Sequence, residues 1–506
     1  MVNEGRFTTR LFSSLLGWLL LLPACVAIGF FSWMPLVGLV RMSMSAIDLA
    51  GARSTYVGLA HFQTLFADGT FNHSLKITVF VVLGKLVFTG LGLWLGHSSA
   101  SYRNQSNLYK LSLSLVTLLG SAGLFYGIFQ GSYIFLLSRN INLGIFGPGP
   151  LALLKGIVLD GLFILPLAIL LGYVITSLTE NNTFKYASQP SAFALSIIFF
   201  LAFGLVTSHL VLDQTIAAFI NTNLQGGVTA QELAAAAGVV LAIPLLILGI
   251  VVWWIMEQQQ PLLAPSSTFH RKNSTQPTWA VYIPLIVVVL LLVPTLALLI
   301  AQQFSEGPSS LGLPFRRWTT NGLLVGGVVA GLQLLLGAMA GYSLNVIKPV
   351  GSRVASLFLT APLFLFPLVL TPFLRIVLFN IGLFDNLWAI ALTLGASPLS
   401  IFIFRLFFAH RQPSNLGPAC LVVILTSFAQ SFAQYQFIQS VILTEDKLTL
   451  IAGLNNLDLF FEYGPTIALR AYGWSLLYSL PQMLLVFLLL VFVLPRLSLS
   501  TRSQTT

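Results

Sequence analysis

Long apolar runs separated by short polar segments dominate the chain. A helix needs about 20 apolar residues to cross a bilayer, and these runs are continuous rather than alternating, which excludes a β-barrel. The pattern predicts an all-α polytopic membrane protein with about twelve transmembrane helices. We place the spans at residues 14–40, 74–97, 108–136, 151–178, 191–220, 231–256, 279–303, 319–345, 352–380, 388–409, 416–444 and 466–494.

One polar, proline-containing segment divides these spans into two sets of six. It predicts a first half at 1–256, a cytoplasmic linker at 257–278 and a second half at 279–506. Each half has a long third span followed by a Leu-Gly or Gly-Leu break, Asn140-Ile-Asn-Leu-Gly-Ile-Phe146 in the first and Asn380-Ile-Gly-Leu-Phe384 in the second. The matching order favours an internal duplication, which is how many transporters surround a central pathway.

Charge is sparse and its distribution bears on topology. The chain is 57% hydrophobic and 8% charged, and its formal net charge of +10 comes from basic residues scattered singly between apolar runs. Such scattering sets membrane topology and is not typical of nucleic-acid binding. With the N-terminus inside, basic residues are slightly more numerous on the inner side and acidic ones on the outer side. We therefore predict that both termini are cytoplasmic.

Residues for catalysis or metal binding are not grouped in the sequence. There is no Walker-type glycine loop, no pair of carboxylates within a span and no His/Cys cluster, so we expect no enzyme activity, cofactor, catalytic residue or metal site. The two cysteines, Cys25 and Cys420, lie in apolar runs and are expected to act as small hydrophobes.

A polar stripe marks one predicted helix, about Gly417 to Leu443. Ser427, Gln430 and Gln434 recur at spacings of three and four residues, which puts them on one helix face. Glutamine donates and accepts hydrogen bonds at once, so the stripe suits a pathway for a hydroxylated solute. The alternative is that these side chains join neighbouring helices.

Lys85 is the most isolated charge within a predicted span. A lone ammonium there costs at least about 2.5 kcal/mol unless it is paired or hydrated. Its expected role is either contact with an anionic ligand or lipid, or an ion pair with an acid of another helix, for which Asp160 and Asp213 are candidates.

The first half resembles a known family of transporters. After the first span come Tyr56-Val-Gly-Leu-Ala-His-Phe62 and then Leu75-Lys-Ile-Thr78. This order is similar to the opening of sugar-importer permeases of the ATP-binding cassette (ABC) superfamily, of the maltose and glycerol-phosphate type. That family has a Tyr/Phe-Val-Gly-Leu-x-Asn-Phe element there and a threonine in the second span.

The second half resembles the partner permease of the same systems. Thr320-Asn321 opens a span that continues to Ala340-Gly-Tyr-Ser343, and Ile381-Gly-Leu-Phe-Asp-Asn-Leu-Trp-Ala389 is similar to the family's Leu-Gly-Leu-x-Asn/Asp-Thr-x-x-Ala. Leu448-Thr-Leu450 and Tyr463-Gly-Pro-Thr-Ile-Ala468 match two further elements near the end. The resemblance covers most of the chain and implies two permease halves of the type I importer fold, fused in one chain.

The chain departs from the family at the cytoplasmic coupling loops. The family carries a Glu-Ala-Ala … Gly motif there, whose short helix docks into the ATPase subunit. Neither Thr179–Pro190 nor His410–Gly417 contains this motif. A turn as short as the second can join two helices but cannot easily present a docking helix.

Two functions remain open from the sequence. The resemblance implies the solute-pathway component of a carbohydrate-type ABC importer in the cytoplasmic membrane, with separate ATP-binding subunits and an extracytoplasmic solute-binding protein as partners. The missing coupling motif favours instead a permease-derived subunit with a structural or assembly role in a larger membrane complex. Membrane lipid is an expected partner in both cases, and nucleic acid in neither.

Overall fold

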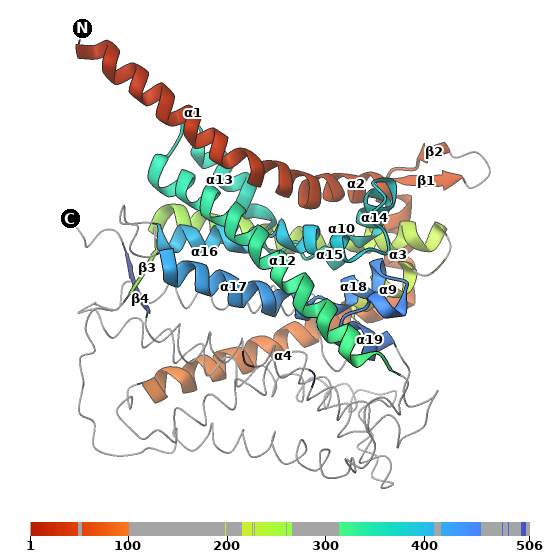
Figure 1. Ribbon diagram of the computed structural model, residues 1–506. Helices are drawn as coiled ribbons and strands as arrows, with labels where there is room; N and C mark the ends of the chain where they lie inside the picture. Colours follow the sequence, from red (N-terminus) through yellow and green to blue (C-terminus); the bar gives the residue numbers. More distant parts are fainter. Residues whose placement is uncertain are drawn as a thin grey trace.

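The computed structural model describes residues 2–48, 53–100, 215–224, 228–259, 261–265, 313–408, 416–456 and 497–501, with isolated positions at 198, 226, 478 and 484. This part of the chain is mostly helical. It contains five helices that are long and apolar enough to cross a membrane. A sixth span would be formed by Ser352–Phe364 and Pro367–Asn380, which are bent by 102° at a short break. The chain is thus a helical membrane protein (Figure 1).

The first half contributes the N-terminal helices and one long helix before the expected linker. Its elements are α1 (Val2–Ile28), the π-helical turn η1 (Gly29–Trp33), α2 (Met34–Ser43), β1 (Ser45–Asp48), β2 (Arg53–Tyr56), α3 (Ala60–Ala67), α4 (Gly69–Ala100), α9 (Ile216–Leu224) and α10 (Val228–Gln259). β1 and β2 form an antiparallel hairpin.

The second half contributes more of the described residues. Its helices are α12 (Phe315–Tyr342), the π-turn η4 (Ser343–Ile347), α13 (Ser352–Thr360), the 3-10 turn η5 (Ala361–Phe364), α14 (Pro367–Asn380), α15 (Leu387–Gly395), α16 (Leu399–Phe407), α17 (Leu416–Ala433), α18 (Tyr435–Val441), the 3-10 turn η7 (Glu445–Lys447) and α19 (Leu450–Asn456). Strand β3 (Pro261–Pro265) pairs antiparallel with β4 (Leu497–Thr501).

Several predicted spans are confirmed and others fall outside the described residues. The helices expected at 14–40, 74–97, 231–256, 319–345 and 388–409 match five candidate membrane-crossing helices. Three predicted spans lie wholly outside the described residues: 108–136, 151–178 and 279–303. Of two others, the structure describes only isolated positions of 466–494 and, apart from position 198, only the end of 191–220. The number of helices and the duplication therefore stay predictions. The expected linker begins inside α10 and includes β3.

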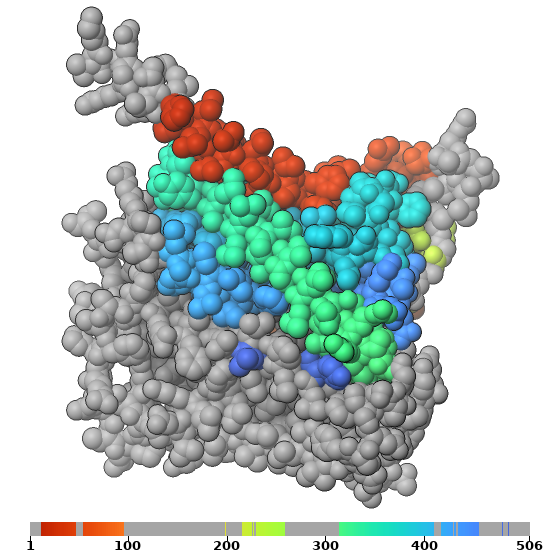
Figure 2. Space-filling view, in the orientation of Figure 1, coloured from red at the N-terminus to blue at the C-terminus, as the bar shows by residue number. Residues whose placement is uncertain are grey.

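The two halves pack directly against each other. α12 is surrounded by α15, α16, α17 and α1, and α10 packs against α2, α9, α14 and η5. One core cluster joins Leu21 and Ile28 of α1 to Leu344, Leu359 and Ile401 of the second half. Helices of the first half therefore pack against helices of the second half. Figure 2 shows α1 and α12 on the visible surface. Both helices carry exposed apolar residues, such as Leu19, Leu22 and Leu335, which suit contact with lipid.

The elements have two well-separated ends. The N-terminus and the β3–β4 ribbon lie at one end, and β1–β2, α3 and α19 lie at the other (Figure 1). Segments predicted to share a membrane side meet: Ser343 donates a hydrogen bond to the Gly17 carbonyl, and the Trp18 indole donates to the Val350 carbonyl.

Candidate functional site

Four helical spans lose regular α-helical geometry around one cavity. The interruptions are the π-turn η1, the break at Leu365–Phe366, the break at Ala396–Pro398 and the break at Gln434. Residues from all four interruptions line the same cavity, whose volume is about 320 Å³. Irregular backbone inside a membrane protein is tolerated where it lines a cavity, and it often marks a transport site.

Proline explains two of these breaks. Pro367 lacks an N–H and begins α14, and the residue before it, Phe366, is extended (φ −62°, ψ 142°). Pro398 similarly precedes the first turn of α16. The span predicted as one helix over 352–380 is therefore two helices bent by 102°.

The break at Gln434 interrupts the predicted polar-striped helix. That helix was expected to run from about Gly417 to Leu443, but α17 ends at Ala433 and α18 begins at Tyr435. Gln434 leaves the helical region, with φ −91° and ψ 37°. The break turns its side chain into the cavity, where Gln430 also lies, so these two predicted residues are brought together.

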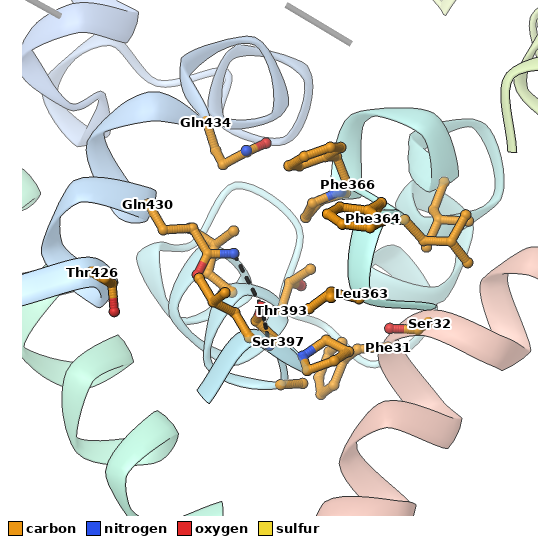
Figure 3. Close-up of a pocket in the computed structure, with 17 residues that line it drawn as sticks. Phe31, Ser32, Leu363, Phe364, Phe366, Thr393, Ser397, Thr426, Gln430 and Gln434 are labelled. Carbon is orange, nitrogen blue, oxygen red and sulfur yellow. Dashed lines mark hydrogen bonds between the residues drawn. The ribbon is translucent and has the colours of Figure 1, made fainter. Parts of the chain in front are cut away.

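The cavity is mostly apolar, with a few polar side chains and, among its 17 lining residues, no charged one (Figure 3). Its size lies at the lower end of the range for small-molecule sites, which are also largely apolar with a few polar groups. The lining comprises Phe31, Ser32, Leu363, Phe364, Leu365, Phe366, Pro367, Leu370, Thr393, Leu394, Ala396, Ser397, Pro398, Leu399, Thr426, Gln430 and Gln434.

One of the polar groups is buried without a hydrogen-bond partner in the described part of the chain. The Thr393 side-chain oxygen is buried and unsatisfied, on a residue only 6% exposed. Gln434 is 7% exposed, and its side chain also lines the cavity. Figure 3 shows the Gln434 amide reaching toward Phe366 across the cavity. A buried polar group without a partner costs about 1–3 kcal/mol, so Thr393 favours a polar ligand, which the Gln434 amide could also bond.

Gln430 is held in place by a hydrogen-bond network centred on Gln333 of α12. Gln333 is fully buried, and its Nε2 donates to the Leu394 carbonyl at 2.8 Å and to Gln430 Oε1 at 2.9 Å. Gln430 Nε2 in turn donates to Ser397 Oγ at 3.2 Å, as drawn in Figure 3. The network fixes one edge of the cavity and leaves little freedom to Gln430.

Ser427 supports this network and does not line the cavity. Its hydroxyl lies 2.8 Å from Gln333 Oε1 and 2.6 Å from the Val423 carbonyl, either of which can accept its hydrogen. The predicted stripe therefore has two roles: Gln430 and Gln434 face the cavity, while Ser427 joins two helices.

Lys85 lies on α4 and does not line the cavity either. It is 2% exposed. The acids considered as partners, Asp160 and Asp213, lie outside the described residues, so its role stays a prediction. Of the segments expected to hold coupling loops, Thr179–Pro190 lies outside them, and so does His410–Gly417 except for Leu416 and Gly417, which begin α17.

A charged cluster ties the chain together beside the end that carries β1–β2. Asp385 Oδ1 accepts from the amides of Leu443 and Thr444 at 2.8 and 2.9 Å, and Oδ2 accepts from the Thr444 hydroxyl at 2.6 Å and from Lys447 Nζ at 2.8 Å. Partial burial alone would raise the pKa of Asp385, but the hydrogen bonds from Lys447 and Thr444 outweigh it and hold that pKa well below its usual range.

The sequence interpretation missed Thr393, Ser397, Thr426, Ser32 and Gln333. The first four are single hydroxyls in apolar runs, and such residues are common in membrane helices. Only Ser397 had a local signal, since it precedes Pro398. No group of His, Cys, Asp and Glu in the described part of the chain could hold a metal ion.

Comparisons with protein-family models, with curated proteins and with solved structures find no significant match to this chain. The proposed function therefore rests on the cavity and on the motifs in the sequence.

Proposed function

We propose that the chain is the membrane-spanning permease component of a carbohydrate-type ABC importer and that the cavity lies on its solute pathway. The chain would then hold two six-helix halves of the type I importer fold, with both termini on the cytoplasmic side of the cytoplasmic membrane. Separate ATP-binding subunits and an extracytoplasmic solute-binding protein would be its partners, as the resemblance implies.

One observation carries this proposal: the cavity at the interrupted spans has no charged residue in its described lining and contains the unsatisfied Thr393 hydroxyl and the Gln434 amide. An ion would need a compensating charge, which the described residues of the lining do not provide. A neutral hydroxylated solute matches the lining better. Its hydroxyls can bond Thr393 and Gln434, and its C–H faces can pack against Phe364 and Phe366.

Ligand binding by the purified chain tests the proposal. Neutral monosaccharides and polyols, with acidic sugars as comparators, are titrated against detergent-solubilised protein and followed by thermal shift and calorimetry. We expect binding of a neutral member and not of its acidic analogue. Loss of one buried hydrogen bond in Thr393→Val should weaken that binding by about tenfold.

Thr449→Val is the matched control. The Thr449 side-chain oxygen is also buried without a partner among the described residues, on a residue 1% exposed, but it lies outside the cavity. The control should bind like the unchanged chain. Equal weakening in both variants, or tighter binding of the acidic sugar, would contradict the assignment.

The alternative is a permease-derived structural subunit, and the absence of the coupling motif from Thr179–Pro190 and His410–Gly417 favours it. Mild purification separates the two functions. An ATPase that co-purifies, and whose turnover rises on reconstitution with the chain, supports the importer. Recovery as a stoichiometric member of an unrelated complex, without solute binding, supports the alternative.

A further inference from the structure

A second group of polar side chains is buried where the two halves meet. Arg405 of α16 donates from one terminal nitrogen to Glu257 Oε1 of α10 at 2.7 Å, and from the other to Ser356 Oγ of α13 at 2.7 Å. Ser356 donates to the same Glu257 oxygen at 2.9 Å. Asn345 of η4 accepts from Arg405 Nε at 3.3 Å and donates to the Arg405 carbonyl at 2.6 Å.

This group is charged, interior and separate from the cavity. The side chain of Arg405 is 6% exposed and that of Glu257 is 23% exposed. None of the four residues lines the cavity. Burying two charges removes them from water, and the attraction between them only partly offsets that cost. A well-packed apolar pair could hold these helices together at least as well, so stability alone does not explain charges at this place.

The position of the group relative to the helix breaks suggests what it does. α13 continues through η5 into the break at Leu365–Phe366, and α16 starts from the break at Ala396–Pro398. Both half-helices leave the cavity toward the same end, and the group fastens both to α10. α16 also contacts β3, which pairs with β4 near the C-terminus.

The half-helices on the other side of these breaks are fastened separately. α14 leads to Asp385 and α15 follows it, and Asp385 bonds Leu443, Thr444 and Lys447, which follow α18. Each side of the cavity therefore has its own polar fastening, and the breaks between the two can act as hinges.

We propose that Glu257, Arg405 and Ser356 form a latch that closes the cavity toward the end of the molecule carrying β3 and β4. Separation of Arg405 from Glu257 frees α13 and α16 from α10 and opens the cavity on that side. The inference rests on the proposed solute pathway, because a latch has a function only if the cavity must open. It adds a gate and its controlling residues to that pathway.

Cysteine accessibility tests the latch in the full-length chain. Cys25 and Cys420 are replaced by alanine, and Thr426→Cys places one thiol on the cavity wall, where the native hydroxyl bonds only its own helix. A membrane-impermeant maleimide is then applied to vesicles of either orientation. A protease-sensitive tag after β4 reports which face carries that end.

Glu257→Gln removes the charge that holds Arg405. We expect labelling from the β3–β4 face to rise about tenfold or more, since breaking a buried ion pair shifts a two-state equilibrium by at least that factor, while labelling from the other face stays unchanged. Asp446→Asn is the matched control, because it breaks the exposed pair with Arg317 near the opposite end. It should leave both rates unchanged.

The remaining variants separate a latch from general loosening. Ser356→Ala removes one hydrogen bond and keeps the ion pair, so it should give a smaller increase on the same face. The exchange of Glu257→Arg with Arg405→Glu should restore slow labelling. Unchanged labelling in both Glu257→Gln and Ser356→Ala, or an equal rise from both faces, would overturn the latch. Solute binding to the unchanged chain is measured separately, so its failure refutes the proposed function and not the accessibility change.

Discussion

The contact between α10 and η5 gives the most direct test of the packing around the cavity. A Cβ added at Gly249 would overlap the Ala361 carbonyl oxygen and lie 2.8 Å from the Ala361 carbonyl carbon. Ordinary van der Waals contact begins near 3.4 Å, and both atoms belong to backbone, so α10 would have to retreat from η5. Since η5 forms part of the cavity wall, Gly249→Ala should disturb both stability and ligand binding.

The expected magnitude follows from two opposing effects. Overpacking by one methyl in a tight site costs about 1–3 kcal/mol, and more when backbone must shift. Replacing glycine by alanine within a helix returns up to about 1 kcal/mol. The overlap here is severe, so we expect Gly249→Ala to lower the free energy of unfolding by about 2 kcal/mol.

Reversible unfolding in mixed micelles measures the difference. Gly327→Ala on α12 is the matched control, because a Cβ there meets no described atom within 4 Å. It should be neutral or stabilising by up to about 1 kcal/mol. A Gly249→Ala chain as stable as the control would refute the close approach of α10 to η5.

Two further predictions concern the polar groups. Because the folded pKa of Asp385 is lowered, its carboxylate stabilises the fold above the unfolded pKa of about 3.9, and that contribution is lost as the pH falls below about 4. The difference in Tm between the unchanged chain and Asp385→Asn should therefore be largest at neutral pH and narrow under acid, and a constant difference would contradict this. Gln333→Leu leaves Gln430 Oε1 without its donor, so it should cost about 1 kcal/mol of unfolding free energy and weaken ligand binding, whereas an unchanged affinity would show that Gln430 does not depend on the network.

The positions of the long helices could be predicted because apolar length alone determines them. The structure has α10 at Val228–Gln259 where 231–256 was expected, and α12 with η4 at 315–347 where 319–345 was expected. The bend after Phe364 could also have been predicted from the sequence, since Pro362, Pro367 and Pro372 lie within one apolar run. The length of this run concealed the bend, because Ser352–Phe364 and Pro367–Asn380 together are as long as one membrane-spanning helix.

The cavity was harder to predict because it depends on tertiary contacts. No proline or glycine marks the break at Gln434, so the sequence indicated an unbroken helix through Ser427, Gln430 and Gln434. Glu257 falls at the start of the predicted linker at 257–278, and Arg405 falls near the end of the span predicted at 388–409. The two residues pair although they are 148 residues apart in the sequence, and the periodicity within one helix gives no information about contacts over such a separation.

The convergence of the breaks has a common physical cause. Each interruption frees backbone N–H and C=O groups that a bilayer cannot satisfy. The Leu394 carbonyl, at the end of α15, shows one solution, since it accepts from Gln333 of a neighbouring helix. A single cavity with a few polar groups can serve several interruptions at once, whereas scattered breaks would each need their own partners. Helix breaks and hydrogen-bonding side chains are therefore expected to lie together, and the cavity between Ser32, Phe366, Ser397 and Gln434 has this arrangement.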